Sequence, residues 1–83
     1  MEYGQRIAYT ILEVGTAVVS KDGVPIGTVT VIRADFDDDI FDGLVIGMPQ
    51  GQRFVEAEHV GDLYENAVLL LLSAEEAHEL PSP

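Results

Sequence analysis

The strongest constraint on the fold is a series of short, β-branched runs separated by turn residues. Two of them, TAVVS (16–20) and IGTVTVIRADF (26–36), are joined through Asp22-Gly23. An Asp-Gly pair between two such runs is typical of a tight β-hairpin, because glycine readily adopts the positive φ that the turn requires. Threonines alternate with valines over 28–31, as expected for a half-buried strand.

Four further segments continue this pattern toward the C-terminus. Strands are predicted over GLVIGMP (43–49), RFVEA (53–57), part of 61–65, and AVLLLL (67–72). Short strands at close spacing with turn residues between them indicate a small all-β barrel of about six strands. Gly27, inside the start of a strand, predicts a bend or a close crossing of two backbones, which small barrels need at their corners.

The N-terminal residues indicate their secondary structure less clearly than the C-terminal residues do. Apolar residues recur at period two in RIAYTIL (6–12), which favours a strand or extended arm over residues 1–13, although other spacings in the segment permit a short helix. At the other end, Ser73 and Glu76 have the spacing of a capping box. They predict a short C-terminal helix over 74–80.

Length and composition are those of one ordered domain. The chain has 83 residues, of which 47% are hydrophobic and 23% charged, so we expect a single domain over 1–83 with the barrel over 14–72. Without cysteine there is no disulfide or thiolate metal site, and the cytoplasm is the default location. The first residues lack the features of a signal peptide. The longest apolar run, 67–72, is far shorter than the ~20 residues that a membrane-spanning helix needs, so direct membrane insertion is not expected.

The charge of the chain excludes one class of partner. Four Lys/Arg stand against fifteen Asp/Glu, a net charge of −11. A nucleic-acid-binding protein needs clustered cations to displace phosphate counterions, and the basic residues here are isolated. We therefore expect no nucleic-acid partner, whereas cationic proteins and divalent metals are electrostatically favoured.

The order of these features resembles the PRC-barrel family. The matching features are Gly15 before the first strand, Asp22-Gly23, Gly27 followed by Val29, the link Glu58-His59-Val60 and the apolar strand 67–72. They cover residues 14–73. The family includes the cytoplasmic domain of the photosynthetic reaction-centre H subunit and the C-terminal domain of a ribosome-maturation factor. The resemblance implies a small β-barrel, here a stand-alone one, and a role in assembly or protein–protein contact without catalysis. It implies no cofactor and no shared catalytic or ligand residues.

The acidic stretch DFDDDIFD (35–42) holds five aspartates. Asp35, Asp37 and Asp39 have the 1-3-5 spacing of a calcium loop. However, isoleucines stand where an EF-hand requires glycine and the bidentate glutamate. The stretch is therefore either a solvated loop between two strands or a divalent-cation site of another kind. The residues of such a site would be Asp37, Asp38, Asp39 and Asp42.

Three large apolar residues, Phe36, Ile40 and Phe41, lie among these aspartates. Either they pack back onto the barrel or they are exposed. Exposed apolar residues rimmed by polar ones mark a binding surface, so the three form a candidate interaction surface.

The remaining polar residues suggest no enzyme. His59 is interpreted as a hydrogen-bonded turn residue, and His78 as a residue near the helix C-terminus, where positive charge is favourable. Neither the serines nor the glycines have the context of a nucleophile elbow or phosphate loop. No catalytic activity is predicted.

These observations predict a protein–protein interaction or assembly module. We expect it to be a homo-oligomer or an adaptor in a larger complex, with AVLLLL (67–72) and LVIG (44–47) as the strands most in need of cover. A divalent-cation-binding module using the aspartates of 35–42 and a barrel that holds a small apolar ligand are the alternatives.

Overall fold

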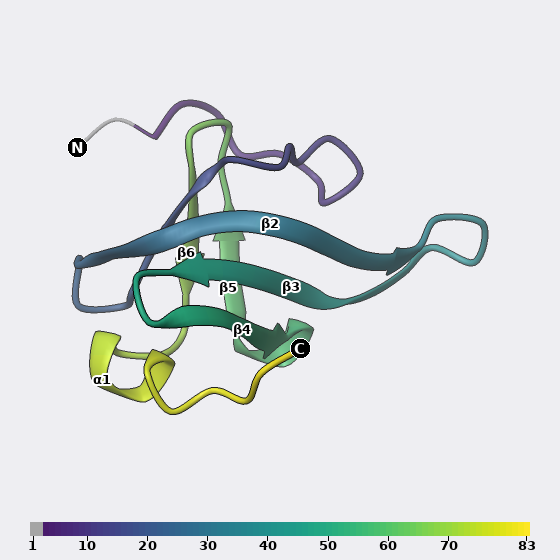
Figure 1. Cartoon of the computed structure of the whole chain (residues 1–83). Helices are drawn as coiled ribbons and strands as arrows, with labels where there is room; N and C mark the ends of the chain where they lie inside the picture. The colour runs from purple at the N-terminus through teal and green to yellow at the C-terminus, as the bar shows by residue number, and fades with distance from the viewer. Residues whose placement is uncertain (1–2) are drawn as a thin grey trace.

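Six strands and a short C-terminal helix make up the computed structural model, which describes residues 3–83 (Figure 1). The all-β class, the six strands and the C-terminal helix were all predicted from the sequence and are confirmed. The elements are β1 (Ala17–Val19), β2 (Pro25–Asp35), β3 (Ile40–Met48), β4 (Gly51–Glu56), the 3-10 turn η1 (Ala57–His59), β5 (Val60–Leu63), β6 (Ala67–Leu70) and α1 (Ala74–Ala77).

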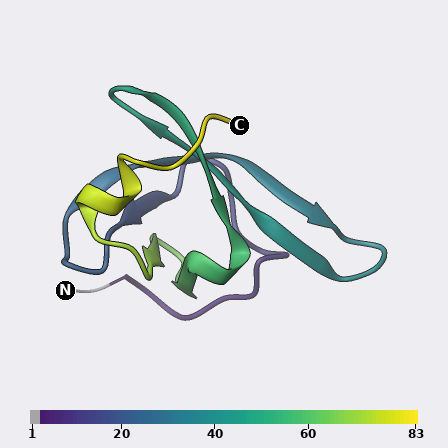
Figure 2. The same ribbon diagram turned by 90° about the horizontal axis from the view of Figure 1, so that it is seen from below.

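The strands form one curled sheet in the order β4-β3-β2-β1-β6-β5. All neighbours are antiparallel except β1 and β6, which run parallel with Val18 opposite Val68. The sheet curls so that its two halves enclose a common interior, as the view from below shows (Figure 2). Since β4 and β5 are the two ends of the order, the barrel is a half-barrel whose open side lies between them, where η1 carries the chain across.

The interior is filled by aliphatic side chains from the inner face of the sheet. Leu12 of the N-terminal arm and Ala77 of α1 complete this packing at its margins. Its buried members are Leu12, Val18, Ile26, Val29, Leu44, Ile46, Met48, Val55, Val68, Leu70 and Ala77. The alternative of a barrel built around an apolar ligand therefore gains no support from residues 3–83, since the chain's own side chains occupy the interior.

At Gly27 the backbones of β2 and β3 approach each other closely. A Cβ built on Gly27 would overlap the carbonyl oxygen of Gly47 and lie 3.0 Å from Cγ2 of Ile46. The close backbone approach predicted for Gly27 is confirmed, and it lets β2 bend across the sheet without a side chain between the strands.

The helix begins at its predicted capping box but is shorter than predicted. The Glu76 amide donates to Ser73 Oγ at 3.1 Å, and the Ser73 amide donates to Glu76 Oε1 at 2.9 Å. The helix ends at Ala77 instead of residue 80. After Ala77 the amides of Glu79 and Leu80 donate to carbonyls three residues earlier, at 3.1 and 3.2 Å, so the helix closes in a tighter turn. The chain then runs beside β4, where the Phe54 amide donates to the Pro81 carbonyl.

The turn between β1 and β2 has the predicted Asp-Gly chemistry and is also joined to the helix. Gly23 has φ 82° and its amide donates to the carbonyl of Ser20. The Ser20 hydroxyl donates to Asp22 Oδ1, which also accepts from the Ala74 amide at 3.2 Å. These bonds lower the pKa of Asp22, the bond from Ser20 being the main cause. The charged carboxylate therefore ties the hairpin to α1.

The expectation that AVLLLL (67–72) and LVIG (44–47) need cover is wrong. They belong to β6 and β3, which have strands on both sides. The edge of β5 is instead met by the N-terminal arm, with Ile7 N donating to the Leu63 carbonyl at 2.9 Å. The predicted strand or arm over 1–13 is, in its described part from residue 3, an arm with an isolated bridge of Arg6 to Tyr64. The arm is extended only at first, because a turn follows in which the Ile11 amide donates to the Ala8 carbonyl and the Leu12 amide to the Tyr9 carbonyl, at 3.0 and 3.2 Å.

The edge of β4 is met by the C-terminal tail, because Phe54 N donates to the Pro81 carbonyl at 2.8 Å. Both sheet edges are thus contacted by segments from the ends of the chain, which lowers the tendency to pair with another chain. None of the helices within residues 3–83 has the length and apolarity required to span a membrane.

Candidate functional site

The acidic stretch forms the tip of a long hairpin that projects from the body of the molecule (Figures 1 and 2). β2 and β3 remain paired as far as Asp35 opposite Ile40. Asp35 Oδ1 accepts from the amides of Asp37 and Asp38, at 3.1 and 3.2 Å, and Asp39 has φ 55°. Aspartate suits both roles, since its side chain bonds the backbone two residues on and it tolerates left-handed φ. The stretch is therefore a structured turn.

Three aromatic rings are stacked beside this turn. The ring centroid of Tyr9, from the N-terminal arm, lies 5.8 Å from that of Phe36 and 5.1 Å from that of Phe41. Offset-stacked pairs at such distances are favourable beyond their buried area. We call Tyr9, Phe36, Ile40 and Phe41 the aromatic tip.

The structure divides the predicted interaction residues into two kinds. Phe41 is half-buried and packs against the core. Phe36 and Ile40 are exposed, at 57% and 49%. Both of the alternatives left open by the sequence therefore apply, to different residues. One of the three side chains anchors the hairpin to the body, and the other two face solvent.

Tyr9 also holds the turn through its hydroxyl group. The hydroxyl donates to Asp39 Oδ1 at 2.6 Å. This bond is the main cause that raises the pKa of Tyr9 from 10.0 to about 12, with a further contribution from the negative charges of Asp39 and Asp35. The neutral phenol is thus the form that the fold stabilises.

We expect Asp39→Asn to return the pKa of Tyr9 toward the ordinary value of about 10. A spectrophotometric titration of phenolate absorbance measures it, and Tyr9→Phe identifies which of the three tyrosines titrates last. Because the folded pKa lies above the unfolded one, the stabilisation from this bond is complete below pH ~10 and is lost between pH ~10 and ~12. A late-titrating tyrosine that persists in Tyr9→Phe would contradict the assignment.

The carboxylates beside the aromatic tip form no ion pair within the described residues, although Arg33 lies on β2 opposite Gly43, next to Asp42. The ion pairs within residues 3–83 are Arg6–Asp62 at 3.1 Å and Lys21–Glu76 at 3.6 Å. Neither involves an aspartate of the hairpin, although Arg6 and Asp62 line the same hollow as Tyr9 and Phe41. Asp37, Asp38 and Asp42 are exposed. The aromatic tip is therefore bordered by exposed aspartates that form no ion pair within the described residues.

The residues of the predicted cation site do not converge. In the part of the chain that the structure describes, no three His, Asp or Glu side chains are grouped so that they could hold a metal ion. One local reason is that Asp39, a member of the predicted site, accepts a hydrogen bond from the Tyr9 hydroxyl. The divalent-cation alternative gains no support from this arrangement.

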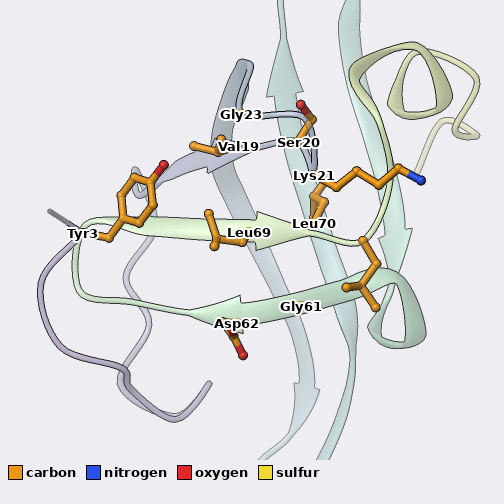
Figure 3. A pocket seen from close by; sticks show the side chains of 10 residues that line it. Tyr3, Val19, Ser20, Lys21, Gly23, Gly61, Asp62, Leu69 and Leu70 are labelled. Carbon is orange, nitrogen blue, oxygen red and sulfur yellow. The ribbon is translucent and has the colours of Figure 1, made fainter. Parts of the chain in front are cut away.

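A shallow hollow of about 370 Å³ lies on the outer face of β1, β6 and β5 (Figure 3). Its floor is apolar, and Gly61 adds no side chain to it; a Cβ there would lie 2.8 Å from the Leu69 carbonyl oxygen and 3.2 Å from Cδ2 of Leu71. Lys21 and Asp62 at its border already pair with Glu76 and Arg6. The residues lining it include Tyr3, Val19, Lys21, Asp62, Leu69 and Leu71. With its charged groups already paired, the hollow is less suited to specific binding than the tip.

Ser20 and the two histidines lie in the first hairpin turn, in η1 and at the end of α1. Ser20 is buried and bonded to Asp22 in the hairpin turn. His78 is the exposed C-cap residue of α1. His59 lies in η1, where its carbonyl accepts from the Leu71 amide at 2.8 Å, as expected for a hydrogen-bonded turn residue. The buried Nδ1 of its side chain has no hydrogen-bond partner.

Tyr9 is the tip residue that sequence reasoning missed. Its period-two spacing with Ile7 and Ile11 indicated a strand but not the segment that it would contact. The stack depends on the path of the arm along β5 and past β3, which no local pattern encodes.

No protein-family model matches the chain, and no curated protein matches it.

Proposed function

We propose that this chain is a non-catalytic protein–protein interaction module, a PRC-barrel-like domain of the cytoplasm that contacts its partner through the aromatic tip. The observation that carries the proposal is the exposure of Phe36 and Ile40 at the end of a projecting hairpin. The curled six-stranded sheet, whose interior is filled by aliphatic side chains, supports the small β-barrel part of this proposal.

The tip is suited to binding because its apolar groups are held in place before a partner arrives. The hairpin is paired to its end, and Tyr9 fixes the turn through two ring contacts and one hydrogen bond. A rigid surface loses less conformational freedom on association, so more of the contact energy is available for affinity. Aromatic side chains are also enriched among the residues that dominate interface energetics.

Self-association is the second form of this proposed function. Tip-to-tip contact between two copies would bring two sets of unpaired aspartates together, and like charges in an interface are costly. A second copy would therefore have to meet the tip with a different surface. A heterologous partner, with the chain acting as an adaptor, is the form that the charge distribution favours.

The test is site-specific photo-crosslinking in the native cells. A photoreactive phenylalanine analogue at position 36 or 40 is expected to give a discrete adduct, whereas the same group at the exposed Glu75 of α1 is not. An adduct of twice the 9.0 kDa chain reports self-association, and one of any other mass reports an adaptor.

A second substitution in the tip tests whether the adduct depends on the apolar surface. With the analogue at position 36, Ile40→Ser should remove most of the adduct while the circular dichroism spectrum stays that of the folded chain. Equal crosslinking from positions 36, 40 and 75 would refute the tip as a contact surface.

A further inference from the structure

We infer that the segment docking on the aromatic tip is cationic, an arginine-rich stretch of a partner protein whose guanidinium groups stack on Phe36 and pair with the surrounding carboxylates. This inference rests on the proposed function and names the chemistry of its partner.

Phe36 and Ile40 form the apolar part of the proposed docking surface. Phe36 stacks on Tyr9 through one face and is still 57% exposed, so much of its π surface is available to a ligand. Ile40, directly after the turn, extends the apolar contact. A planar guanidinium suits such a ring, because it stacks on aromatic faces and is more weakly hydrated than an ammonium group.

The aspartates around the ring favour a docking segment that is positively charged. Asp37, Asp38 and Asp42 are exposed, and neither of the ion pairs within residues 3–83 involves them. Docking an uncharged or acidic segment would desolvate these carboxylates without a counter-charge, which is costly. Arginine compensates them with charge-assisted, often bidentate, hydrogen bonds.

The geometry of the turn keeps these carboxylates in reach of a ligand. Asp35 and Asp39 are engaged by the loop amides and by Tyr9, whereas the other three have no such bonds to the turn. The tip therefore presents exposed carboxylates around an exposed ring. A second copy of this chain is a poor source of the cationic segment, because its four Lys/Arg are isolated along the sequence.

The probe is a synthetic peptide of alternating arginine and glycine, titrated into ¹⁵N-labelled protein by NMR. We expect amide shifts to concentrate at Tyr9 and over residues 36–42 and to weaken as salt is added. The same peptide with citrulline in place of arginine should give no shifts. A lysine version should bind several-fold more weakly, because it lacks the planar fork.

Two triple variants with the same net charge distinguish binding at the tip from binding that depends only on the net charge of the chain. D37N/D38N/D42N should weaken the peptide about tenfold or more. E13Q/E75Q/E79Q, which neutralises three exposed carboxylates outside the hairpin, should change affinity less than about twofold. Phe36→Ser should weaken binding by several-fold, with the remaining amide spectrum confirming that the chain is folded.

The outcomes separate this inference from the function on which it rests. Equal loss in both triple variants, or shifts centred elsewhere, would show binding by net charge alone and overturn the inference. If the arginine peptide does not bind at low salt but position 36 still yields its adduct, the partner is not cationic and the interaction function stands. If position 36 yields no adduct, the proposed function itself fails.

Discussion

The Gly27→Ala variant is expected to lose about 3 kcal/mol of unfolding free energy or more, a large part of the roughly 4–12 kcal/mol expected for a chain of this length. The new methyl group would overlap the carbonyl oxygen of Gly47. A backbone oxygen in a paired strand cannot rotate away as a side chain can, so β2 and β3 must separate. Urea denaturation followed by circular dichroism measures the loss, and the melting temperature should fall by roughly 12–24 °C.

Gly23→Ala is the matched control for this effect. Gly23 has φ 82° and nothing within 4 Å of a Cβ, so alanine there is disfavoured only by backbone conformation, by about 1–2 kcal/mol. No positive φ is recorded at Gly27, and its cost is steric. A Gly27→Ala variant more stable than Gly23→Ala would show that the sheet shifts to admit the methyl group.

Leu44→Ala is expected to cost about 2–5 kcal/mol, the range for truncating a fully buried leucine. Leu44 has no exposed surface and lies in the middle of the core. The variant leaves a cavity that its neighbours on β2 and β4 fill only partly, because hydrogen bonds hold those strands in place. The free energy from chemical denaturation gives the loss.

Leu71→Ala makes the same chemical change at a position that is 56% exposed. We expect it to alter stability by no more than about 0.5 kcal/mol, as for most surface substitutions. Comparable losses in the two variants would mean that the outer hollow beside Leu71 is buried in solution, for instance by a second copy of the chain. That result would redirect the search for a contact surface from the tip to the hollow.

The local elements were predicted well because they depend on local chemistry. Asp22-Gly23 makes the first hairpin because glycine adopts positive φ without strain, and Ser73 with Glu76 begins the helix because their side chains satisfy free amide groups. The end of the helix was overestimated. It depends on the tail binding along β4, a contact between distant parts of the chain.

The candidate site was predicted only in part. The aspartates and the large apolar residues of 35–42 were singled out by their types, but which apolar residues are exposed could not be read from a hairpin sequence alone. Phe41 is drawn inward by the core and by Tyr9, a residue thirty-two positions earlier in the chain. Phe36 has the same chemistry but lies beyond the last strand pair, where less of the body is in reach.

The amino-acid sequence by itself determined the class of the fold, the hairpin turn, the close approach at Gly27 and the acidity of the chain, since each follows from residue type and short-range spacing. Only the tertiary structure decided that β6 pairs in parallel with β1, that the arm and the tail contact the sheet edges, and that Tyr9 stacks between Phe36 and Phe41. Those features join segments far apart in the chain, and their stability comes from packing that exists only once the whole sheet has curled.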